Sequence, residues 1–188
     1  QSSRLFQYED KADIINIEPA RQKDWLRSDI SLVQAKVDNI RFKETKQKEP
    51  QLDIHYTIES SQYGNKTGKR LFIPVNIFHK GFYSPSNQGE RTQDIQINYG
   101  YLDIDSLNIR LPEGYEIESL PKTTDMETKF GKFHSSITLE EGGNILIVHR
   151  LLFHQGNYPK EDNTDFMDFR KNVATQYAAK IIVKKSGE

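Results

Sequence analysis

Apolar and polar residues alternate along most of this chain, with the period of two that marks a β-strand buried on one face. The clearest run is Leu52–Ile58, in which apolar residues alternate with aspartate, histidine and threonine. Further strands are expected at residues 33–37, 70–78, 94–101, 133–139 and 144–154. Lys43–Pro50 has the composition of a charged loop. The pattern therefore predicts an all-β body of antiparallel strands packed as a sandwich.

The stretch Tyr99–Pro121 has the pattern of a strand, a tight turn and a second strand. At its centre is Pro112-Glu113-Gly114, where proline presets φ and glycine is free to take a positive φ. The flanking apolar residues are Ile104, Leu107, Ile109 and Leu111 before this turn and Tyr115, Ile117 and Leu120 after it. The glycine pair in Glu141–Asn144 indicates a hairpin turn. Because proline cannot donate to a ladder, Pro74 predicts an edge strand or a bulge.

One segment has helical spacing. After Pro159, apolar residues recur at steps of three and four, at Phe166, Phe169, Val173 and Tyr177. This stripe predicts a helix over Asn163–Ala178 whose aromatic side chains face a sheet. Ile181–Val183 then predicts a terminal strand. The expected fold is an antiparallel β-sandwich-like domain with one C-terminal amphipathic helix followed by a terminal strand.

The first 29 residues lack this alternation. Ile14, Ile15 and Ile17 indicate a short strand that Pro19 ends, and Ala20–Leu26 indicates one helical turn. We therefore expect an irregular segment at residues 1–29, which would serve as a linker from a removed upstream domain, and a β-sandwich-like domain at residues 30–188. Because the chain begins with glutamine rather than methionine, we expect that a leader or a larger upstream part has been removed.

Composition excludes several kinds of function. The formal net charge is −1, from 26 lysines and arginines against 27 acidic residues, so there is no basic surplus for binding nucleic acid. The absence of cysteine removes disulfides, thiolate nucleophiles and cysteine-based metal sites. No apolar run is long enough for a membrane span.

The remaining candidates for chemistry have simpler explanations as strand residues. The histidines are His55, His79, His134, His149 and His154, and their spacing forms no ligand pair. Asp103 and Asp105 share one strand face, as do Glu116 and Glu118, and we interpret both pairs as the ordinary polar face of a strand. No serine lies in a nucleophile elbow. We therefore predict no catalytic residue, no metal site and no cofactor.

Four aromatic residues in or beside loops are the candidate binding residues: Phe78, Phe82, Tyr83 and Tyr158. Exposed loop aromatics can form a platform for a glycan or a peptide. They can equally fold back to cover the open ends of a sandwich. The centre of the candidate surface is the loop His79–Glu90, which contains Phe82 and Tyr83.

The second half of the chain carries a set of motifs found together in one family. They include Ile-x-Ile-x-Tyr-Gly-Tyr-x-Asp-x-Asp at 95–105, Leu-Pro-Glu-Gly-Tyr-Glu-Ile-Glu-Ser-Leu-Pro at 111–121, Thr-Lys-Phe-Gly-Lys-Phe at 128–133 and Lys-Ile-Ile-Val-Lys-Lys at 180–185. In these motifs the chain resembles the C-terminal domain of unknown function that ends bacterial transglutaminase-like proteins, after a core with the papain-like fold. The resemblance extends more weakly to Arg70–Asn76.

This resemblance implies a non-catalytic accessory domain of an exported protein, in the periplasm or at the cell surface. Its partner would be the upstream transglutaminase-like domain of the same polypeptide. The Cys-His-Asp triad of the family belongs to that central domain, and a chain without cysteine cannot carry it, so we expect no enzymatic activity here. The alternative is a free-standing β-sandwich module that binds a glycan or a peptide. The parent reading frame distinguishes the two.

Overall fold

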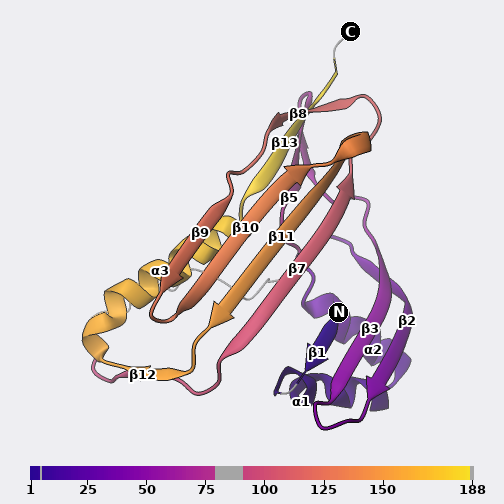
Figure 1. Ribbon diagram of the computed structural model, residues 1–188. Coiled ribbons are helices and arrows are strands. Elements are labelled where there is room, and N and C mark those ends of the chain that lie inside the picture. Colours follow the sequence, from indigo (N-terminus) through magenta and orange to yellow (C-terminus); the bar gives the residue numbers. More distant parts are fainter. Residues whose placement is uncertain (5, 79–90, 187–188) are drawn as a thin grey trace. The chain divides into compact units, whose positions relative to one another are not determined.

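The computed structural model of the chain describes residues 1–4, 6–78 and 91–186 (Figure 1). The described residues form two compact units. The N-terminal unit comprises those within Gln1–Tyr63 and Ile77–Gly81, and the C-terminal unit comprises those within Gly64–Asn76 and Phe82–Glu188. No described helix has the length and apolar content needed to cross a bilayer.

The N-terminal unit is a three-stranded antiparallel sheet with helices. Its strands, in the order β1-β3-β2, are β1 (Ser2–Arg4), β3 (Gln51–Glu59) and β2 (Lys36–Thr45). Its helices are α1 (Phe6–Ala12), a 3-10 helix (Asp13–Asn16) and α2 (Pro19–Ser28). Its buried core consists of Ile14, Leu26, Ile30, Ala35, Val37, Leu52 and Ile54.

Three expectations for this unit were wrong. The first 29 residues are largely helical, and the isoleucines expected in a strand lie in or beside the 3-10 helix, where all three contact the core. Pro19 begins α2 instead of only ending a strand, because its missing N–H has no partner to lose in a first helical turn. Strand β2 continues to Thr45, three residues into the expected loop.

The C-terminal unit contains two four-stranded antiparallel sheets. One has the order β7-β11-β10-β9, from β7 (Tyr101–Arg110), β11 (Asn144–Phe153), β10 (Gly131–Leu139) and β9 (Thr124–Thr128). The other has the order β4-β5-β13-β8, from β4 (Asn65–Thr67), β5 (Arg70–Pro74), β13 (Lys180–Lys185) and β8 (Tyr115–Ser119). A further pair joins β12 (Gly156–Tyr158) to β6 (Ile95–Ile97).

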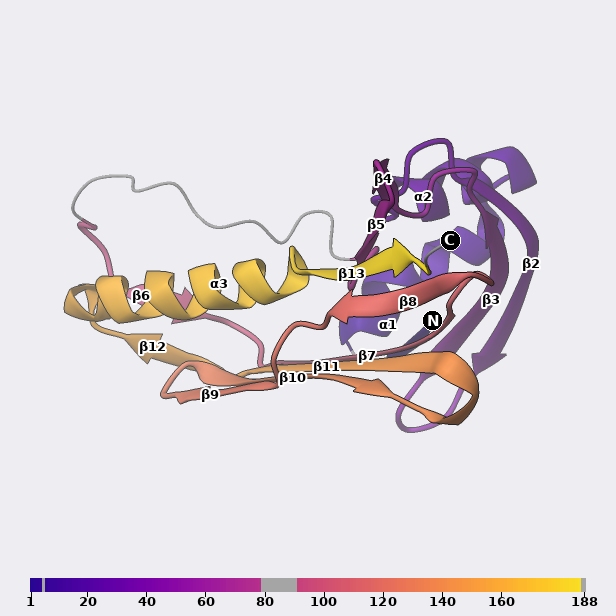
Figure 2. The same ribbon diagram turned by 90° about the horizontal axis from the view of Figure 1, so that it is seen from above.

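The predicted fold class is confirmed in this unit. Helix α3 (Asn163–Tyr177) precedes the terminal strand β13, and Figure 2 shows both on the same side of the β7-β11-β10-β9 sheet. The helix buries Phe169, Val173 and Tyr177 in a cluster with aromatic and aliphatic residues of β10 and β11. The aromatic stripe read from the sequence is therefore the face that packs on the sheet.

The predicted turns are also confirmed. Gly114 has a φ of 74°, and Gly142 and Gly143 have φ values of 77° and 79°. The first of these turns connects β7 to β8, which belong to different sheets, so Tyr99–Pro121 carries the chain across the sandwich. The edge strand or bulge expected from Pro74 was wrong for β5 as a whole, since β5 lies between β4 and β13 without a register shift. Pro74 itself is tolerated because it lies beyond Phe72, the last residue of β5 that β4 pairs.

Candidate functional site

Two of the four aromatic candidates, Phe78 and Tyr158, lie in the described part of the chain, and they belong to different units. Phe82 and Tyr83 lie outside the described residues, as does the loop His79–Glu90. Phe78 is half-buried in the N-terminal unit. The Tyr158 hydroxyl donates to the Lys129 carbonyl oxygen at 3.1 Å, and its ring packs edge-on against a buried phenylalanine, at 4.8 Å between centroids. Both ends of Tyr158 thus make contacts within the C-terminal unit.

Strand β7 has its carboxylates on the inner face of the sheet. Asp103 and Asp105 share one face, as predicted, but it is the half-buried face that also carries Leu107. The solvent side instead carries Leu102 and Ile104, which are 46% and 55% exposed. The interpretation of the two aspartates as the ordinary polar face of a strand was therefore wrong.

Polar side chains gather where β7, β11 and α3 meet. We call Tyr101, Asp103, Asp105, His149 and Tyr177 the inner polar cluster. Asp105 is the ladder partner of His149, whose side chain is almost completely buried. The ring of Tyr177 meets the His149 ring edge-on at 5.4 Å, and His149 Nε2 lies 3.3 Å from the Val75 carbonyl oxygen.

This environment keeps the tyrosines protonated. Burial, with a smaller contribution from the Asp103 carboxylate and opposed by Arg170, raises the pKa of Tyr101 to about 12. Burial also raises the pKa of Tyr177, with smaller contributions in the same direction from Asp105 and Asp103. A phenol whose pKa is raised is a poor base at neutral pH, so neither tyrosine is suited to abstract a proton.

The cluster has a structural role at a sheet edge. Within residues 1–4, 6–78 and 91–186, no three acidic or histidine side chains stand together as metal ligands. Strand β7 is an edge of its sheet. Charged residues that point inward from an edge strand disfavour the addition of another strand, because the added strand would cover them. Asp103 and Asp105 have this placement.

The raised tyrosine pKa values predict a loss of stability at alkaline pH. The folded state holds these protons to higher pH than the unfolded chain, in which tyrosine titrates near ~10. The stabilising contribution of the protonated tyrosines to the free energy of unfolding is thus complete below pH ~10. It falls as the pH rises toward about 12, the pKa of folded Tyr101. Tyr101→Phe should make this fall shallower in urea denaturation at a series of pH values. An identical fall in the Tyr101→Phe variant would contradict the assignment of this loss of stability to Tyr101.

The outer face of β7 and β11 is aliphatic. We call Leu102, Ile104, Leu146, Val148 and Leu152 the aliphatic face. Leu102 and Leu152 are ladder partners, and Leu146 and Val148 continue along β11 on the same side. The ladder partners of Leu146 and Val148 on β7 are polar, so these aliphatic side chains are only half-covered by neighbours. In Figure 1 this side of the sheet faces the viewer, and no described helix or strand of the C-terminal unit is drawn over it.

The charged side chains around the aliphatic face differ in whether they form ion pairs. Toward β9, Lys132 Nζ lies 2.6 Å from a Glu127 carboxylate oxygen, and His134 Nδ1 lies 2.7 Å from an Asp125 carboxylate oxygen. Arg150 lies on β11 opposite Ile104 and is exposed. It makes no ion pair with any described residue. Among the described residues, no carboxylate thus pairs with the positive charge next to the aliphatic side chains.

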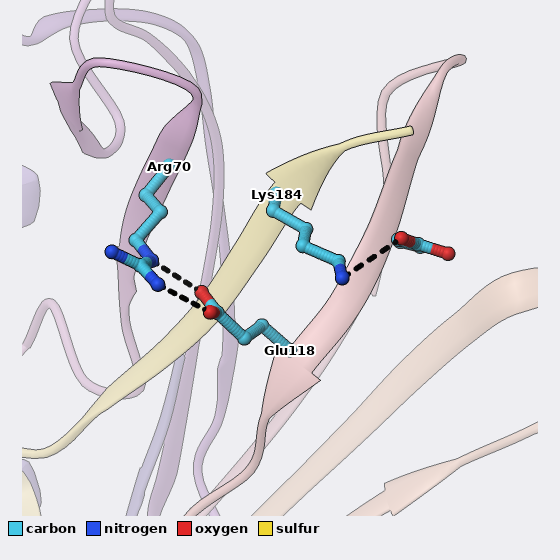
Figure 3. A network of polar contacts seen from close by, with 4 residues as sticks. Arg70, Glu118 and Lys184 are labelled. Carbon is cyan, nitrogen blue, oxygen red and sulfur yellow. Dashed lines mark hydrogen bonds and ion pairs between the residues drawn. The ribbon is translucent and has the colours of Figure 1, made fainter. Parts of the chain in front are cut away.

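The second sheet carries a self-neutralised network on its exposed face (Figure 3). Arg70 donates twice to the Glu118 carboxylate, at 2.6 Å each, and Lys184 Nζ lies 3.3 Å from Glu116. The bonds from Arg70 lower the pKa of Glu118 and raise that of Arg70. Glu116 and Glu118 therefore form a polar strand face, as predicted, that links β8 to β13 and β5.

Comparison with known families gives one match. Residues 69–183, more than half of the chain, match the family described as a domain of unknown function with a solved structure, DUF3858. Neither the curated proteins nor the solved structures include a match to this chain. The matched segment contains the four strands of the β7-β11-β10-β9 sheet together with β5, β8 and α3, and so the inner polar cluster and the aliphatic face.

Proposed function

Since this chain belongs to the DUF3858 family, we propose that its C-terminal unit is a non-catalytic accessory domain that binds another protein domain through the aliphatic face. The partner is an upstream transglutaminase-like domain of the same polypeptide, in a protein exported to the periplasm or cell surface. The motifs described above, from Ile95–Asp105 to Lys180–Lys185, support this choice of partner.

The observation that carries the proposal is the exposure of aliphatic side chains on two paired strands. Leu102 and Ile104 are about half exposed, next to three more aliphatic residues of β11 on the same face. Contiguous apolar surface of this kind marks interaction sites in soluble proteins. Full burial of an exposed leucine, isoleucine or valine contributes roughly 1.5–3 kcal/mol, and covering these half-exposed side chains would contribute a part of that for each. A partner domain is therefore a source of stability for this face.

The chemistry of the described residues supports a role without catalysis. The most perturbed titratable groups are tyrosines held in their neutral form, and the carboxylates beside them point inward from an edge strand. The chain has no cysteine to serve as the nucleophile of a transglutaminase-like triad. These features favour a domain that positions or assembles a catalytic partner.

The test is a binding measurement between this chain and the separately purified transglutaminase-like domain encoded upstream. Ile104→Asp should weaken the Kd at least about tenfold, because the complex would bury an uncompensated carboxylate. Thr67→Asp, at an exposed strand position on the other sheet, is the matched control and should leave the Kd unchanged. Circular dichroism verifies that both variants fold.

Two results would overturn the proposal. A parent reading frame without a transglutaminase-like domain would remove the partner. Equal binding by the wild type and the Ile104→Asp variant would place the contact elsewhere. In either case, binding of a defined glycan or peptide by the isolated chain would support the alternative function, a free-standing binding module.

A further inference from the structure

We infer that the segment covering the aliphatic face combines aliphatic residues with a carboxylate, and that this carboxylate pairs with Arg150. The inference rests on the proposed function and names the chemistry of the partner. Three observations support it: the position of Arg150, the charges around it, and the carboxylates that face inward from the neighbouring edge strand β7.

Arg150 stands within the aliphatic face. On β11 it lies between Val148 and Leu152, and on β7 its ladder partner is Ile104. A partner that covers these aliphatic side chains must also cover the guanidinium or leave a gap over it. Covering a charge without an opposite charge is costly, whereas a carboxylate matches the guanidinium through two hydrogen bonds.

The carboxylates on the same face of the sheet do not pair with Arg150. Asp125 and Glu127 lie on β9, two strands from β11, and are already paired with His134 and Lys132. The acid that pairs with Arg150 in a complex must therefore come from the partner.

A second copy of this chain is a poor partner for the same reason. In a symmetric face-to-face dimer, the same patch meets itself. Arg150 lies inside that patch, so each guanidinium would be covered by a copy of the aliphatic face, which carries no carboxylate. Covering a charge without an opposite charge is unfavourable. The charge pattern thus favours an acidic partner over self-association.

Addition of a strand to the edge of β7 is also disfavoured. The new strand would extend the inner face of the sheet over Asp103 and Asp105, at the cost of desolvating their carboxylates. The partner therefore lies across the outer face instead of extending the sheet.

A second exposed arginine sets a length scale. Arg110 is six residues beyond Ile104 on β7 and lies on the same outer face, so it is about 20 Å from the Arg150 position along the sheet. No ion pair joins Arg110 to another described residue. An extended partner segment that follows the strands would place acidic residues about six positions apart to meet both arginines.

The experiment uses a displayed library of random 12-residue peptides as the probe. The purified chain is the bait, and peptides that also bind the Ile104→Asp variant are removed. We expect the remaining peptides to combine aliphatic residues with aspartate or glutamate. Arg150→Glu should weaken their binding about tenfold, and changing the acidic peptide residue to lysine should restore it in that variant. Lys66→Glu, at an exposed strand position on the other sheet, is the matched control and should leave the binding unchanged.

Three results would overturn the inference: peptides without acidic residues, binding that Arg150→Glu leaves unchanged, or no peptide that depends on Ile104. A dimer of the free chain in sedimentation equilibrium would also do so. These outcomes are separate from failure of the proposed function. If Ile104→Asp abolishes binding to the transglutaminase-like domain while Arg150→Glu does not, the accessory role stands and only the charge pairing is wrong.

Discussion

Replacing Phe169 with alanine should lower the free energy of unfolding by about 3–5 kcal/mol. Phe169 is only 2% exposed and lies in the middle of α3, where its ring meets the Phe153 ring edge-on at 5.6 Å. Removing the ring leaves a cavity between the helix and the β7-β11-β10-β9 sheet, and neighbouring aromatic side chains are too rigid to fill it. Urea denaturation followed by far-UV circular dichroism measures the change.

Phe166→Ala is the matched control for this substitution. Phe166 is also on α3 and also meets aromatic rings, that of Phe130 at 5.1 Å and that of Phe153 at 6.5 Å, but it is only half-buried. Its removal should therefore cost clearly less than that of Phe169. If Phe169→Ala costs under about 1 kcal/mol, or no more than Phe166→Ala, the helix does not depend on this residue for its packing on the sheet.

The sequence was sufficient to predict the parts of the fold where one periodic signal dominates. The stripe from Phe166 to Tyr177 predicted α3 to within one residue at its C-terminal end. Gly114 and the pair Gly142 and Gly143 predicted turns because a positive φ is unfavourable for other residues. The N-terminal helices were mostly missed, because three isoleucines in a short segment fit a strand and a buried helical turn equally well.

The inner and outer faces of β7 could not be assigned from its own sequence. One face carries Leu107 and Ile109 with two aspartates, and the other carries Leu102 and Ile104 with polar residues. Each face thus has two aliphatic side chains, and a period of two fixes which residues share a face but not which face is buried. Pairing with β11 decides the question, since its inner face is more strongly apolar.

The same ambiguity hides the aliphatic face in the sequence. Exposed aromatic residues in a loop stand out in a sequence, whereas exposed leucines and isoleucines in a strand look like core. The sequence places Ile104 among the apolar residues of its strand, and nothing nearby marks it as exposed. Arg150 gave a weak signal, since it interrupts an apolar run at an outward position. Only the ladder register shows that the two residues are neighbours.

Gly131→Ala should destabilise the C-terminal unit by about 3 kcal/mol, although it adds a single methyl group. A Cβ at this position would overlap the carbonyl oxygen of Leu152 on the neighbouring strand. The backbone has little freedom to move away, because Thr128 Oγ1 accepts from the Phe130 N–H and donates to the Gly131 carbonyl oxygen, both at 3.2 Å. Phe130 is itself completely buried. The strain therefore falls on the β10–β11 ladder at its first residue pair.

Gly68→Ala separates this clash from ordinary backbone strain. Gly68 has a φ of 60° and open space around the position of a Cβ, so alanine there should cost only about 1 kcal/mol. Denaturation of both variants under the same conditions gives the comparison. A cost for Gly131→Ala equal to or below that of Gly68→Ala would mean that β10 shifts freely against β11. A clearly larger cost would identify the close approach of the two strands as a fixed feature of the sheet that carries the aliphatic face.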